Sequence, residues 1–238
     1  MNCLIIAAGT GGRLREKGPS KPLIPIGGIP LIERVITRAR AAGIDRFFVV
    51  SGYRGEEVRA ALDRFSAREA LPIVHIVNED WRRANGISVL KARPYLQGVF
   101  LLTMCDHLLD PQILRGLASA TPAPQTVTLA VDFNVEGSIN DLEDVTRVKC
   151  SAGRIELVGK VIPGFNAIDT GVFLCAPIIF DALEASQAAG DDSLSGAMNV
   201  LAGWGKARAF DIGGRLWLDV DDPISLRKAE ELLATGRL

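Results

Sequence analysis

The chain has 238 residues, of which 48% are hydrophobic and 23% charged, which is enough for one large or two small domains with an apolar core. This composition argues against a disordered or collagen-like chain. Lys and Arg total 27 and Asp and Glu total 28, so the formal net charge of −1 gives no global reason to expect a nucleic-acid or anionic-membrane partner.

Short apolar runs alternate with helical patterns over residues 1–133. This alternation is typical of βαβ units around a mostly parallel sheet. The expected strands are residues 4–8, 46–51, 71–77, 99–105 and 126–133. The expected helices are residues 30–42, 55–65 and 87–95, followed by a helix that Pro111 opens.

The pattern changes after residue 133. Residues 145–150 and 154–158, joined by Ser151-Ala152-Gly153, predict an antiparallel hairpin. Further expected elements are strands at 170–175, 207–212 and 216–220 and helices at 177–188 and 223–233. We therefore predict one α/β domain over residues 1–238, with a Rossmann-like, mostly parallel sheet flanked by helices and a small antiparallel hairpin region.

Four scattered cysteines form no Cys-x-x-Cys pair, and three of them lie in apolar runs. Small buried thiols are therefore favoured over a zinc site or a disulfide framework. No apolar run approaches the roughly 18 to 20 residues that span a bilayer. The chain start lacks a basic segment and is typical of a core strand rather than a signal peptide. We expect a cytoplasmic protein.

The loop after the first strand carries the strongest chemical signal. It reads Gly9-Thr10-Gly11-Gly12-Arg13, and Lys21 follows in a Ser-Lys-Pro-Leu stretch. Glycines let backbone N–H groups approach a phosphate closely, and the two cations add positive charge. A dinucleotide fingerprint would need a glycine where Leu14 stands, and a Walker loop would need Gly-Lys-Ser/Thr. The remaining alternative is a tight turn with two solvated cations.

Asp106 stands at the carboxyl end of an apolar strand, the edge at which open α/β sheets bind ligands. A carboxylate there suits Mg²⁺, which prefers hard oxygen ligands and shares them with phosphates. Capping of the next helix is the alternative, but Asp110 before Pro111 already provides that cap. The neighbouring His107 is interpreted as structural, as a lone histidine beside a site usually is.

Asp219 and Asp221 form a second acidic pair, on one side of the strand expected at 216–220. Asp222, before Pro223, is the natural N-cap of the last helix, so the pair has no capping role. Two packed carboxylates repel, which makes a divalent cation a reason for them. A solvated acidic strand end is the alternative.

In this order, the glycine loop, the two cations, Asp106 and the late Trp-x-Asp resemble the sugar-nucleotidyltransferase superfamily across essentially the whole chain. Its members join an NTP to a phosphorylated sugar or alcohol and release pyrophosphate. The compact spacing from Arg13 to Lys21 resembles, more narrowly, the CTP:inositol-1-phosphate cytidylyltransferases. The stretches that carry this likeness are residues 13–25, 30–36, 104–107, 159–160 and 166–171. Gly12 departs from the family, which commonly has Ser or Thr there.

The resemblance implies roles for individual residues, with nucleotide binding in about 1–133 and acceptor binding in about 134–238. The implied nucleotide-binding set is Ala7, Ala8, Gly9, Thr10, Gly11, Gly12, Arg13, Lys21, Asn78, Asn85, Gly86 and Ser88. The implied acceptor-binding set is Lys160, Asn166, Asp169 and Thr170, and the implied Mg²⁺ ligands are Asp106, Asp219 and Asp221. The expected catalytic residues are Arg13, Lys21, Asp106 and Lys160.

Three members of these sets, Asn85, Gly86 and Lys160, have simpler interpretations. Asn85-Gly86 is also an ordinary turn sequence. Without the resemblance, Lys160 would be a solvated lysine at a strand end. We keep them as candidates, because Asn side chains suit the cytosine edge and a cation suits the acceptor phosphate.

The function that the resemblance implies is a Mg²⁺-dependent cytidylyltransferase. It would join CTP and L-myo-inositol 1-phosphate to give CDP-inositol and pyrophosphate, and a membrane phosphotransferase could use the product. A phosphate monoester is already anionic near pH 7, so positioning and charge neutralisation suffice for catalysis. The alternatives are another acceptor (choline phosphate, an aminoalkylphosphonate or a hexose 1-phosphate) or a non-catalytic nucleotide-binding module.

Overall fold

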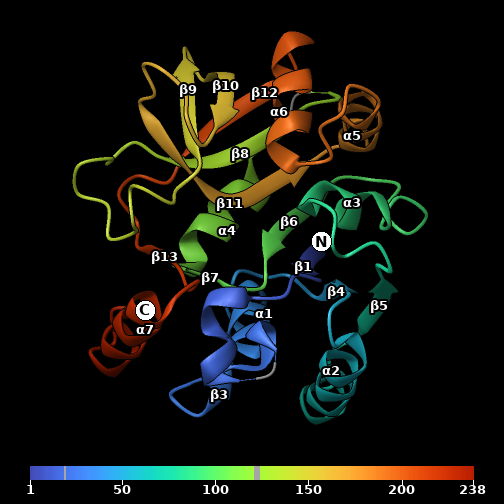
Figure 1. Cartoon of the computed structure of the whole chain (residues 1–238), viewed down its shortest axis with the longest axis vertical. Helices are drawn as coiled ribbons and strands as arrows, with labels where there is room; N and C mark the ends of the chain where they lie inside the picture. Colours follow the sequence, from blue (N-terminus) through green and yellow to red (C-terminus); the bar gives the residue numbers. More distant parts are fainter. Residues whose placement is uncertain (19, 121–123) are drawn as a thin grey trace.

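The computed structural model describes residues 1–18, 20–120 and 124–238 (Figure 1). The strands of its central sheet are β1 (Asn2–Ala7), β4 (Arg46–Ser51), β5 (Ile73–Val77), β6 (Phe100–Met104), β8 (Val127–Asp132), β9 (Arg147–Ser151), β10 (Arg154–Gly159), β11 (Ala167–Cys175) and β12 (Ala207–Asp211). These nine strands follow the order β5-β4-β1-β6-β11-β8-β12-β10-β9. The sheet therefore contains strands from both sides of residue 133.

The amino-terminal part of the sheet is parallel. β1 pairs in parallel with both β4 and β6, and β4 pairs in parallel with β5. β11 then runs antiparallel to β6 and β8, and β9 and β10 form the expected antiparallel hairpin. The predicted α/β architecture with a small hairpin region is confirmed.

The part of the chain that the structure describes contains seven α-helices. They are α1 (Leu31–Ala41), α2 (Gly55–Glu69), α3 (Asn85–Leu90), α4 (Pro111–Ser119), α5 (Ile178–Ala188), α6 (Leu194–Gly203) and α7 (Pro223–Ala234). Asp110 and Asp222 cap α4 and α7 as expected, since their carboxylates accept hydrogen bonds from Gln112 N and from Ile224 N and Ser225 N. None of the described helices has the length and apolar character needed to cross a bilayer.

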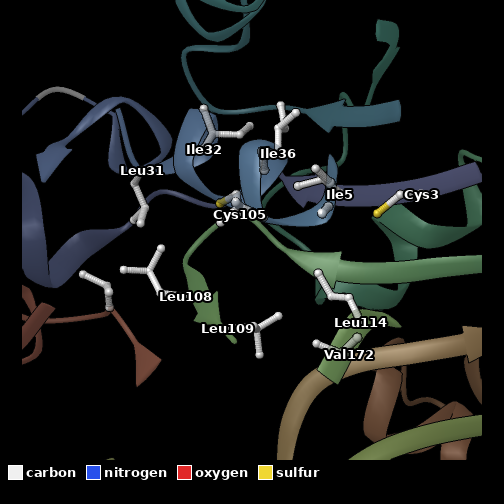
Figure 2. Packing of buried hydrophobic residues seen from close by; sticks show 14 of the residues in the cluster. Cys3, Ile5, Leu31, Ile32, Ile36, Cys105, Leu108, Leu109, Leu114 and Val172 are labelled. Carbon is white, nitrogen blue, oxygen red and sulfur yellow. The ribbon is translucent and has the colours of Figure 1, made fainter. Parts of the chain in front are cut away.

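Two hydrophobic cores lie on the two faces of the sheet, because successive side chains of a strand point to opposite faces. Cys3, Ile5 and Ala7 of β1 join the core that α1 and α4 cover, and Figure 2 shows Ile5 beside Ile36 there. Their neighbours along β1 join the other core, which α3, α5 and α6 cover. All four cysteines are buried and free, including the three in apolar runs for which the sequence favours buried thiols.

Some elements differ from the expectations. α6 was not predicted, because its two glycines and small residues hide a helical pattern. α3 begins at Asn85 and ends at Leu90, not at 87 and 95. Two short strand pairs were also missed in part: β2 (Pro25–Ile26) with β3 (Ile29–Pro30), and β7 (His107–Leu109) with β13 (Trp217–Asp219).

The β7–β13 pair lies outside the central sheet and positions the site (Figure 1). The two strands are antiparallel, and Asp219 stands opposite His107 in their register. The pairing therefore brings the late acidic segment to the end of β6, where Asp106 lies.

Candidate active site

The glycine loop leaves β1 and turns back against Lys21. Gly11 has a φ of 58°, and a Cβ there would lie 2.3 Å from Lys21 Cβ, so only glycine fits. Within the described residues, Gly9 and Gly12 have open space where a Cβ would point. The loop thus keeps its backbone accessible while packing closely on the lysine.

Lys21 and Arg13 are held by carboxylates. Lys21 Nζ lies 2.5 Å from Asp106 Oδ2 and 2.5 Å from Asp221 Oδ1, and its side chain is only 7% exposed. Arg13 forms ion pairs with Asp221 and, at 2.6 Å, with Asp144 Oδ2. The two cations expected to bind phosphate therefore converge on one acidic group of residues.

Asp106, His107 and Asp219 form a cluster that could hold a metal ion. One ligand atom from each lies within 4.8 Å of the others. Within the described part of the chain, Asp106 Oδ1 and Asp219 Oδ1 are buried without a hydrogen-bond partner. Buried carboxylate oxygens that lack donors fit a divalent cation, which would satisfy them.

This cluster differs from the expected ligand set in one residue. The two carboxylate oxygens of Asp221 form ion pairs with Lys21 and Arg13, so Asp221 is not part of the cluster. His107, which we interpreted as structural, takes a place between the two carboxylates, 3.4 Å from Asp106 Oδ1 and 3.5 Å from Asp219 Oδ2. The backbone pairing of β7 with β13 explains this exchange, because it places residue 219, not 221, opposite His107.

The charges of the cluster shift each other's proton affinities. Burial alone would lower the pKa of His107, but the Asp219 and Asp106 carboxylates outweigh it and raise the pKa to about 9. Burial opposes ionisation of Asp219, yet the cations of His107 and Lys21 hold its pKa below the usual range. Lys21 also has a raised pKa, because Asp106 and Asp219 outweigh the effect of its burial. His107, Lys21 and Asp219 therefore carry their charges at neutral pH.

A cavity of about 450 Å³ opens beside the cluster. Five residues of the expected nucleotide-binding, acceptor-binding and metal-ligand sets line it: Asn85, Lys160, Asp169, Asp219 and Asp221. Its lining includes Asn85 from the expected nucleotide-binding set and Lys160 and Asp169 from the expected acceptor-binding set. Its size suits a small ligand.

The expected base-reading residues surround the amino-terminal end of α3. Asn78 is buried, and its Nδ2 donates to Ser88 Oγ at 2.9 Å. Asn85 Oδ1 accepts from Leu194 N at 2.9 Å, and Gly86 packs so closely that a Cβ would lie 2.4 Å from Asp192 O. Asn85-Gly86 is thus the first turn of a helix rather than a simple loop turn.

Two of the four expected acceptor residues lie elsewhere. Asn166 bonds to both backbone groups of Cys150, at 2.9 and 3.0 Å, and does not line the cavity. Thr170 is fully buried, and its hydroxyl donates to Ala130 O at 2.8 Å. Each polar group is satisfied by backbone, so the structure assigns both a role in holding the sheet together.

Sequence reasoning missed Asn140. Its Oδ1 accepts from Asp219 N at 2.9 Å and its Nδ2 donates to Trp217 O at 3.3 Å, so this side chain extends the hydrogen bonding of β13. It thereby fixes the backbone that carries Asp219. Asn140 lies in a polar loop between β8 and β9, where no spacing or periodicity marks it.

The pKa of Asp169, a residue that lines the cavity, should make the stability of the protein depend on pH. Burial raises the pKa of the Asp169 carboxyl from 3.8 to about 6, although Gly171 N donates to it at 2.7 Å. Since the folded state holds the proton more strongly than the unfolded chain, ionisation of Asp169 lowers stability as the pH rises from about 4 to 6. Asp169→Asn should therefore raise stability at pH 7 by on the order of 2 kcal/mol and change it little near pH 4. Thermal unfolding across this range measures it, and a gain that is the same at both pH values would contradict the shift.

A glycine loop, a buried lysine and strand-end carboxylates at the carboxyl edge of parallel strands define an α/β protein built to bind a nucleotide polyphosphate. The chain belongs to the family of the MobA-like NTP transferase domain, whose model matches residues 3–198. This family model ends before β13 and therefore does not cover Asp219.

Two curated relatives and one solved structure extend this comparison. The "Bifunctional IPC transferase and DIPP synthase" of Rubrobacter xylanophilus is 36% identical over 233 residues, covering 96% of this chain and 51% of the relative. The protein of the same name from Aquifex aeolicus is 29% identical over 235 residues, covering 97% and 51%. The inositol-1-phosphate CTP transferase from T. maritima superposes with a TM-score of 0.87 at 25% identity, covering 98% of this chain and 94% of that one. The chain spans about half the length of the curated relatives it matches.

Proposed function

We propose that this chain is a cytidylyltransferase that joins CTP and inositol 1-phosphate to give CDP-inositol and pyrophosphate. One observation carries the proposal: a single cavity is lined by Lys160 and Asp169 and reaches the Asp106–Asp219 cluster at the edge of the sheet. The likeness to the inositol-1-phosphate CTP transferase from T. maritima along nearly the whole chain supports the choice of substrates.

The nucleotide end is formed by the glycine loop with Arg13 and Lys21. Backbone N–H groups of the open loop would bind the β- and γ-phosphates, and the two cations would neutralise them. Mg²⁺ held by Asp106 and Asp219, with His107 between them, would supply further charge neutralisation at the α-phosphate. Lys21 belongs to both groups, since it already contacts Asp106.

The cytosine would lie at the start of α3. Asn85 lines the cavity, and because its Oδ1 already accepts from Leu194 N, it would offer its Nδ2 as a donor to the base. Asn78 and Ser88, hydrogen-bonded to each other at 2.9 Å, would keep that end of the helix in place behind it.

In the proposed reaction an oxygen of the acceptor phosphate attacks the α-phosphorus of CTP in line. A new P–O bond forms, the bond to the β-phosphate oxygen breaks, and pyrophosphate leaves with that electron pair. No proton has to move, because the attacking phosphate is already an anion. Lys160 would hold it in position, and the carboxylate of Asp169 would accept hydrogen bonds from ring hydroxyls.

Pyrophosphate release from the four NTPs with inositol 1-phosphate, a hexose 1-phosphate, phosphocholine and an aminoalkylphosphonate tests this function. CTP should exceed UTP in kcat/KM by about ten- to a hundredfold, because the wrong base leaves buried polar groups unpaired. Inositol 1-phosphate should be the best acceptor. Turnover of another acceptor in its place would refute the inositol assignment, and equal use of CTP and UTP would refute the cytidylyl one.

Two variants separate the acceptor contacts. Lys160→Ala should lower kcat/KM for every phosphorylated acceptor by about ten- to a hundredfold, since it removes a charge that all of them meet. Asp169→Ala should act mainly on inositol 1-phosphate, through its hydroxyls. Lys149→Ala is the matched control, because Lys149 is paired with Glu156 on the neighbouring hairpin and does not line the cavity.

The fate of the product completes the proposal. A CDP-activated polyol is a donor for a phosphotransferase that releases CMP, and a membrane enzyme of that class is the partner we propose.

A further inference from the structure

Asp144 links the two ends of the site. Its Oδ2 lies 2.6 Å from Arg13 Nη1, while its Oδ1 lies 3.4 Å from Lys160 Nζ. Lys160 Nζ also donates to the backbone carbonyl of Asp144. One carboxylate thus contacts the cation of the nucleotide end and the cation of the acceptor end.

These contacts are exposed, unlike those of Lys21. The side chains of Asp144, Arg13 and Lys160 are 39%, 54% and 60% exposed, whereas that of Lys21 is 7% exposed. Exposed ion pairs are weak and readily exchanged, because water and salt screen them. A doubly charged phosphate can replace a single carboxylate on either cation.

The position of Asp144 in its loop fits this exchange. Asp144 N and Val145 N both donate to Asp141 O at 3.0 Å, so the residue sits in a local turn beside the cavity. The carboxylate reaches the cations from this turn and takes part in no other ion pair among the described residues. Its side chain can therefore leave the cations while the turn stays formed.

We infer that Asp144 is an internal anion that occupies Arg13 and Lys160 until substrate phosphates replace it, so that binding of one substrate eases binding of the other. A triphosphate that binds Arg13 removes one of the two cations that hold the Asp144 carboxylate beside Lys160. Asp144 then competes less strongly with the acceptor phosphate for Lys160. The same argument holds in reverse, since coupling between two binding sites is reciprocal. The inference rests on the proposed function only for the identity of the two substrates.

Titration of inorganic tripolyphosphate by calorimetry at low salt tests the competition. Asp144→Asn should bind it about three- to tenfold more tightly than the wild type, and the difference should shrink as salt screens the wild-type ion pairs. Glu143→Gln, which removes the same charge from the next, exposed residue, should bind like the wild type. Equal or weaker binding by Asp144→Asn would overturn the inference, and it would instead assign Asp144 a role in positioning the cations. Asp144→Ala, checked for folding by circular dichroism, should change affinity in the same direction.

The coupling is measured with inositol 1-phosphate and the α,β-methylene analogue of CTP, which prevents turnover. In the wild type the analogue should strengthen acceptor binding more than it does in Asp144→Asn, by about threefold. The same ratio in both proteins would overturn the coupling. If neither protein binds inositol 1-phosphate, the proposed function is wrong, while the tripolyphosphate titration still decides whether Asp144 competes for Arg13.

Discussion

Asp106→Asn and Asp219→Asn should each lower kcat at saturating Mg²⁺ by about 10²- to 10³-fold. Each variant removes one charged oxygen from a cluster whose free oxygens are buried and lack donors. An amide keeps the shape but offers one neutral oxygen, which is a poorer ligand for a hard cation. Steady-state pyrophosphate release measures the loss.

Folding should survive both changes. Lys21 keeps Asp221 as a partner in either variant, and His107 keeps the other carboxylate of the cluster, so neither buried cation is left without an anion. Asp110→Asn is the matched control, because Asn caps a helix as well as Asp does. Within the described structure, residue 110 forms no ion pair with Arg13 or Lys21. Near-normal turnover in either cluster variant, with Asp110→Asn unaffected, would remove the metal assignment.

Lys21→Met should lower stability by about 3 kcal/mol in the absence of divalent cations, and should lower activity at least a hundredfold. The ammonium contacts both Asp106 and Asp221 at 2.5 Å, and its removal deprives two partly buried carboxylates of the cation they share. Added Mg²⁺ should raise the Tm of the variant more than that of the wild type, because the ion replaces part of the missing charge.

Thermal unfolding with and without Mg²⁺ measures both effects. Lys17→Met provides the comparison, since Lys17 is exposed in the same loop. Stability of Lys21→Met equal to that of Lys17→Met would mean that the buried ion pairs contribute nothing.

The sequence predicted well which residues meet at the site, but it predicted less well which of them contact one another. The glycine loop, Lys21 and Asp106 follow strands whose apolar runs are unmistakable, and parallel strands bring their carboxyl ends to one edge. Asp219 was identified by its lack of a capping role. The sequence could not tell that Asp221 contacts Lys21 and Arg13 instead of the cluster. That placement depends on the register of the β7–β13 pair, which no local pattern specifies.

Polar residues near strand ends were the least predictable. Asn166 and Thr170 match the family pattern, but a side-chain amide and a hydroxyl can satisfy backbone groups as well as a ligand, and here they do. Asn140 and Asp144 lie in an irregular loop, where function depends on contacts with residues far along the chain. Such contacts leave no periodicity to read.

The β7–β13 pair has a consequence for how the protein becomes active. It joins residues 107 and 219, nearly half the chain apart, and the second carboxylate of the cluster reaches its place only through this pairing. During synthesis the glycine loop and Lys21 emerge early, whereas Asp219 emerges after the central sheet has its last strand, β12. A ribosome-bound or proteolysed chain without β13 would have the glycine loop but an incomplete acidic cluster. On the proposed function, competence for chemistry would therefore depend on the last part of the chain to be synthesised.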